Sequence, residues 1–119
     1  MATQYLESPH LDYKVLGALE EVMEQDYPLL LDTFLSDSSA RVDELHRARD
    51  AQQLGNAAHS FKGSSSNMGA TLLAELCRQL EERARQKPLT GIEELVHRID
   101  AEFVIIQRLY QTERDRFPG

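Results

Sequence analysis

The chain has 119 residues, one cysteine, no tryptophan and a formal net charge of −7. The length fits one domain over residues 1–119, with a core large enough to fold without metal or disulfide support, and the single cysteine favours a reducing compartment. The acidic charge argues against nucleic-acid binding and against docking on anionic lipid.

No apolar run approaches the ~20 residues of a membrane span, and the start MATQYLESPHLDYK lacks the apolar stretch of a signal peptide. We therefore expect a cytoplasmic protein. Four prolines and six glycines are too few for a chain rich in β-turns. The apolar spacing is helical nearly throughout, so an all-α fold is predicted.

The first predicted helix begins after Asp12, which can cap it, and follows a segment, residues 1–10, that we expect to be mobile. Its apolar positions are taken to be Val15, Leu19 and Val22. A break at residues 25–28 precedes the second helix. Asp26 or Tyr27 would cap this helix, with Pro28 in its first turn, where the missing N–H costs little.

The second helix is expected to run to about Arg49. One apolar stripe defines it: Leu31, Phe34, Leu35, Val42 and Leu45. The serine-rich stretch at residues 36–39 interrupts this stripe. We interpret it as helix because the stripe resumes in phase, although a turn is the alternative.

Asp50 and Gln53 have the spacing of a capping box and predict the start of the third helix, which ends near Asn67-Met68-Gly69. Its core-facing positions are Leu54, Ala58, Phe61, Ser65 and Met68. The fourth helix, with Leu73, Leu76, Cys77, Leu80 and Ala84 in its stripe, stops at residues 87–91.

The last helix has its apolar residues at Ile92, Leu95, Val96, Ile99, Phe103, Ile106 and Tyr110. Short connections between long amphipathic helices favour antiparallel neighbours. The predicted fold is an up-down antiparallel four-helix bundle with an additional N-terminal helix.

His59 lies off the core stripe of its helix. At about 100° per residue it is roughly 160° from Phe61 around the axis, so it is expected to face solvent. Its neighbours one turn away are Gly55, Lys62 and Gly63. Glycine inside a helix costs about 1 kcal/mol relative to alanine, and access of another molecule to the imidazole would explain both glycines.

The same segment is free of acidic residues. Residues 51–74 contain no Asp or Glu, where about four would be expected at the chain average, and their one formal charge is Lys62. Such surroundings suit an anion, above all phosphate. The alternative, an ordinary surface histidine, is left open by these residues alone.

The segment His59-Ser60-Phe61-Lys62-Gly63-Ser64-Ser65-Ser66-Asn67-Met68-Gly69-Ala70 resembles the signature of histidine phosphotransfer (HPt) domains, and the Leu-Cys-x-x-Leu-Glu run ending at Glu81 continues it. The resemblance implies a phosphorelay intermediate. His59 would take a phosphoryl group from the aspartyl phosphate of a receiver domain, such as that of a hybrid sensor kinase, and pass it to the aspartate of a response regulator.

The resemblance also implies roles for the surrounding residues. Lys62 would offset charge on the phosphoryl oxygens, Gly63 would leave room for the receiver, and the Mg²⁺ would belong to the receiver, with no cofactor of the chain's own. In the family a Gln or Glu 22 positions after the histidine often holds its second nitrogen, which places Glu81 in that role. An ordinary glutamate paired with Arg78 or Arg85 is the alternative, and Ser66 is a further candidate donor.

The remaining candidates carry weaker signals. His46 and Asp50 alone are too few ligands for a metal ion. His97 is expected on a helix surface and His10 in the N-terminal segment. Cys77 lies on a core stripe and is expected to be a buried packing residue. The Ser64–Ser66 run lacks the order of residues in a P-loop.

We therefore expect a monomeric phosphocarrier without kinase activity of its own. Met68 and Leu30 are suggested as receiver contacts. The alternatives are a bundle that binds or inhibits two-component proteins without carrying phosphate, and a hydrolase built on His59, Ser66 and Glu81, which lacks a plausible cleft.

Overall fold

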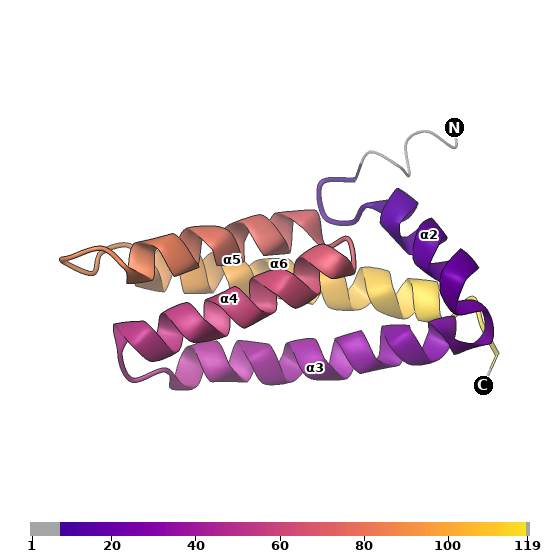
Figure 1. Cartoon of the computed structure of the whole chain (residues 1–119), viewed down its shortest axis with the longest axis horizontal. Coiled ribbons are helices and arrows are strands. Elements are labelled where there is room, and N and C mark those ends of the chain that lie inside the picture. The colour runs from indigo at the N-terminus through magenta and orange to yellow at the C-terminus, as the bar shows by residue number, and fades with distance from the viewer. Residues whose placement is uncertain (1–7, 119) are drawn as a thin grey trace.

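The computed structural model describes residues 8–118 (Figure 1). All its regular elements are helical, and in chain order they are α2 (Tyr13–Met23), the short 3₁₀ helix η1 (Glu24–Asp26), α3 (Tyr27–Arg47), α4 (Ala51–Asn67), α5 (Thr71–Ala84) and α6 (Ile92–Arg114).

Four of these helices form a closed bundle. Helix α4 packs against α3 and α5, and α6 completes the ring by packing against α5 and α3. Helix α2 lies obliquely across one end of the bundle, near the C-terminal part of α6 (Figure 1). The predicted all-α bundle with an extra N-terminal helix is confirmed.

The helix ends follow the expected capping with small differences. Asp12 accepts a hydrogen bond from Lys14 N, and Asp50 accepts one from Gln53 N at 2.8 Å. The Gln53 side chain accepts from the backbone N–H of Arg49 rather than from that of Asp50, so the capping box is not reciprocal. Helix α3 is continuous through residues 36–39, and α5 ends at Ala84, before the predicted break.

The stripes predicted for α3 to α6 supply most of the core, and Leu11, Leu16 and Tyr27, which those stripes did not include, add to it. Its largest fully buried side chains are Tyr27, Tyr110, Phe61, Leu11, Leu16, Leu31, Leu73, Leu80, Ile99 and Ile106. The prediction for α2 is wrong in part: Val22 is 77% exposed, and Leu16 is the residue that this helix buries.

The N-terminal segment is tied to the turn between α4 and α5. Gly69 adopts the left-handed conformation (φ +81°), and a Cβ there would lie 3.0 Å from the Asp12 carbonyl oxygen. Asp12 N donates to the Gly69 carbonyl at 2.8 Å. His10, expected in a mobile segment, instead contacts the buried Glu102 of α6, with 2.7 Å between Nδ1 and Oε2. Residues 1–7 of that segment lie outside the described residues.

Candidate functional site

His59 stands on the solvent-facing side of α4, as its helical position predicts. Its side chain is 66% exposed. Gly55 and Gly63 lie one turn away on either side, and a Cβ added to Gly63 would meet nothing within 4 Å. No packing contact therefore requires glycine at position 63, and the open space beside the imidazole is available to another molecule.

Glu81 of α5 holds one nitrogen of this imidazole. The distance from His59 Nδ1 to Glu81 Oε2 is 2.8 Å, and the carboxylate side chain is only 9% exposed. An ionised carboxylate can only accept hydrogen bonds, so Nδ1 carries the proton of the neutral ring. The lone pair is then on Nε2, which is the form needed for nucleophilic attack.

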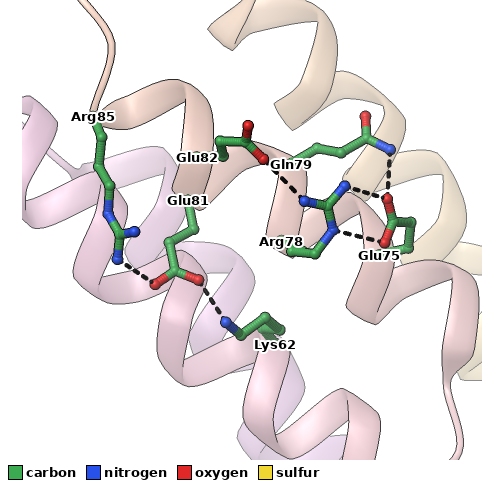
Figure 2. A network of polar contacts seen from close by, with 7 residues as sticks. All are labelled: Lys62, Glu75, Arg78, Gln79, Glu81, Glu82 and Arg85. Atoms are coloured by element: carbon green, nitrogen blue, oxygen red, sulfur yellow. Dashed lines mark hydrogen bonds and ion pairs between the residues drawn. The ribbon is translucent and has the colours of Figure 1, made fainter.

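Two cations share the same carboxylate. Lys62 Nζ donates to Oε1 at 2.7 Å, and Arg85 Nη2 donates to Oε2 at 3.1 Å (Figure 2). The two interpretations of Glu81 were thus not exclusive, because it contacts both His59 and Arg85. Arg78 is not a partner: it bonds Glu75 and Glu82 in a separate network on α5 (Figure 2).

The surroundings keep Glu81 ionised. The hydrogen bond from Lys62 lowers the pKa of the Glu81 carboxyl below its ordinary value, burial opposes this, and the hydrogen bond from His59 adds to the lowering. One anion and two cations make this cluster positive in a protein whose net charge is −7. The local charge favours an incoming anion.

A hollow of about 490 Å³ opens beside the imidazole. His59, Glu81 and Arg85 line it, together with the polar side chains of Gln52 and Asn56. We did not single out Gln52 and Asn56 from the sequence, although they precede His59 by seven and three positions and so share its helix face. Gly55 and Ala84 also line the hollow, and a Cβ on Gly55 would lie 3.6 Å from that of Ala84.

A smaller groove lies on the other side of the cluster. Lys62 and Ser66 line it with Arg78, and His59 does not. Within the described part of the chain no hydrogen bond joins Ser66 to His59, so the expected donor role has no contact to support it. Of the suggested receiver contacts, Met68 is wrong because it is buried (6% exposed), while Leu30 is half-buried.

The other candidate residues have ordinary structural roles. His46 pairs with Asp100 of α6 at 2.8 Å rather than with Asp50, and His97 is exposed. Cys77 is fully buried, as predicted, and burial raises the pKa of its thiol to about 12. Among residues 8–118, no group of three or more His, Cys, Asp or Glu side chains could hold a metal ion. No helix in that range is long and apolar enough to cross a bilayer.

Comparisons with known proteins agree with this geometry. The family model described as "Hpt domain" matches residues 29–111. A crystal structure of histidine-containing phosphotransfer protein B (HptB) from Pseudomonas aeruginosa PAO1 is similar, with a TM-score of 0.89 and 50% sequence identity over 94% of this chain and 100% of that chain. No curated protein sequence matches the chain. With most of its length matched by the family model, and with a half-identical structural relative, this chain belongs to the Hpt domain family, the phosphocarriers of phosphorelays.

Proposed function

We propose that His59 is the residue that carries the phosphoryl group, taking it from the aspartyl phosphate of one receiver domain and passing it to the aspartate of another. The observation that carries this proposal is the contact between His59 Nδ1 and Glu81 Oε2 at 2.8 Å on an otherwise exposed imidazole. This contact keeps the imidazole proton on Nδ1 and leaves Nε2 of His59 open to a partner.

The transfer is an in-line displacement at phosphorus. The Nε2 lone pair of His59 forms the N–P bond while the P–O bond to the receiver's aspartate breaks, and that electron pair leaves with the carboxylate. The ring keeps its Nδ1 proton and becomes positively charged, and the carboxylate of Glu81 stabilises this charge. The return reaction to the second receiver runs through the same steps in reverse.

The neighbours of His59 serve docking and charge compensation. Gly63 leaves the imidazole accessible to the receiver's active-site loops, and Lys62, bound to Glu81, adds positive charge to the site that receives the phosphoryl group. The Mg²⁺ that transfer requires is contributed by the receiver, and the chain acts as a monomeric carrier that does not phosphorylate itself from ATP. A receiver of a hybrid sensor kinase is the proposed donor and a response regulator the proposed acceptor.

A two-step relay tests this function. A phosphorylated receiver and Mg²⁺ are mixed with the protein, and a second receiver is then added. We expect acid-labile, base-stable label to pass from the first receiver to the chain and then to the second. Wild type that binds the receivers without taking up label would instead identify a non-phosphorylated interaction or inhibitor module. His97→Gln, which alters another exposed histidine, is the matched control for His59→Gln.

A further inference from the structure

Arg85 is the cation that shares the hollow beside the imidazole. His59, Glu81 and Arg85 all line this hollow, whereas Lys62 lines the groove on the far side of the cluster, which His59 does not border. A group attached to Nε2 of His59 and extending into the hollow would therefore approach Arg85.

Arg85 is also the more weakly held of the two cations on Glu81. Its contact with the carboxylate is 3.1 Å long and its side chain is 75% exposed, while the Lys62 contact is 2.7 Å long and that side chain is 32% exposed. An exposed ion pair of this kind contributes little stability, so its exchange for another anion costs little.

The charges in the cluster change when His59 is phosphorylated. In the form of the ring that attacks phosphorus, Nε2 carries a lone pair, and Lys62 and Arg85 together face the single negative charge of Glu81. After transfer the ring is positively charged, so His59 and Lys62 together compensate the negative charge of Glu81 without Arg85. The phosphoryl group meanwhile brings a charge of about −1.5 to −2 and three acceptor oxygens into the space beside Arg85.

We propose that Arg85 moves from Glu81 to the phosphoryl group on His59 and stabilises the phosphorylated form of the protein. The planar guanidinium suits this role because it can donate to two phosphoryl oxygens at once. Its contact with Glu81 uses only one nitrogen, Nη2. Glu81 then remains bound to the Nδ1 proton and to Lys62. This inference rests on the proposed function, since it requires that His59 carry the phosphoryl group.

The test is the equilibrium between two phosphorylated proteins. Wild type and Arg85→Gln are each mixed with one receiver domain, Mg²⁺ and a limiting amount of phosphoryl groups, and the ratio of phosphohistidine to aspartyl phosphate is measured. We expect Arg85→Gln to lower this ratio about threefold to tenfold, the range for an exposed charged contact to a phosphoryl group. Arg85→Lys, which keeps the charge but not the fork, should fall between the two.

Arg83→Gln is the matched control, because Arg83 is an exposed arginine on the same helix that donates to the Thr90 carbonyl. A second readout is the side-chain NMR signal of Arg85, which should shift when His59 is phosphorylated with phosphoramidate and no receiver is present. An Arg85→Gln ratio within twofold of wild type, or an Arg85 signal that does not move, would overturn the inference while leaving the proposed function intact. Wild type that takes no label at His59 from either donor would overturn both.

Discussion

Replacing Glu81 by alanine should slow phosphoryl transfer to His59 without weakening receiver binding. The substitution removes the acceptor 2.8 Å from Nδ1, so the ring is free to place its proton on Nε2, where it blocks attack. It also removes the carboxylate that stabilises the positive ring formed in the transfer. Because the Glu81 side chain is only 9% exposed, it offers little contact area to a docking receiver.

The size of the effect follows from the strength of the hydrogen bond that the substitution removes. A hydrogen bond to a charged group contributes about 1.5–3 kcal/mol, equivalent to roughly tenfold to a hundredfold in rate. Because the His59 side chain is 66% exposed, water can partly replace the carboxylate, and we expect a decrease of about tenfold in the transfer rate. Glu81→Gln keeps an acceptor oxygen and should have a smaller effect.

The assay is single-turnover transfer from a phosphorylated receiver, together with the Kd of the receiver for each variant measured by calorimetry. Glu82→Ala is the matched control, because Glu82 is the adjacent, exposed glutamate and bonds Arg78 instead of the site residues. A transfer rate for Glu81→Ala within twofold of wild type would refute the role given to this carboxylate. A decrease in rate explained wholly by a weaker Kd would refute it as well.

The other predictions concern access, burial and pH. Gly63→Ala should leave the free energy of unfolding unchanged or raise it by up to about 1 kcal/mol, because the added Cβ meets no atom within 4 Å, but it should slow phosphoryl transfer. Gly17→Ala on α2, where a Cβ also meets no atom within 4 Å, is the control: it should have the same effect on stability and transfer at the wild-type rate. Cys77 should not react with DTNB at pH 8 in the native protein and should react once urea unfolds it, because burial raises the pKa of its thiol to about 12. His10→Ala should lower the free energy of unfolding in urea by about 1–3 kcal/mol by leaving a buried carboxylate unpaired; an unchanged urea midpoint would contradict this. The pKa of the Glu81 carboxyl is lower in the folded protein than its ordinary value of 4.5, so the ionised carboxylate stabilises the fold above pH 4.5. This stabilisation is lost as the pH falls through the pKa that Glu81 has in the folded protein. The Tm of wild type should therefore drop more steeply below pH 4.5 than that of Glu81→Gln.

The long helices were predictable because their apolar stripes have a single phase. In α4 and α5 the spacing identified all the buried side chains except Ala57 and Glu81, and it placed His59 on the opposite face. Helix α2 was harder, because its many apolar residues fit two phases. The stripe through Val15, Leu19 and Val22 and the one through Leu16, Leu19 and Met23 both have helical spacing, and packing against the bundle selects the second.

Contacts between distant residues were beyond the reach of periodicity. The position of Glu81 came from the resemblance to HPt domains, and nothing local in the sequence shows that its carboxylate turns toward His59. The pair of His10 and Glu102 is separated by 92 positions and has no sequence signature. Met68 was placed both in the core stripe and at the docking surface; the structure keeps it in the core, where its carbonyl accepts from Tyr110.

The central claim is that the phosphoryl group resides on Nε2 of His59. Phosphorylating the protein with a labelled receiver and mapping the label by fragmentation mass spectrometry, with ³¹P–¹⁵N couplings to identify the nitrogen, tests this most directly. We expect one phosphoryl group, on Nε2 of His59, and none on His59→Gln. Label on another residue, on Nδ1, or undiminished on His59→Gln would contradict it.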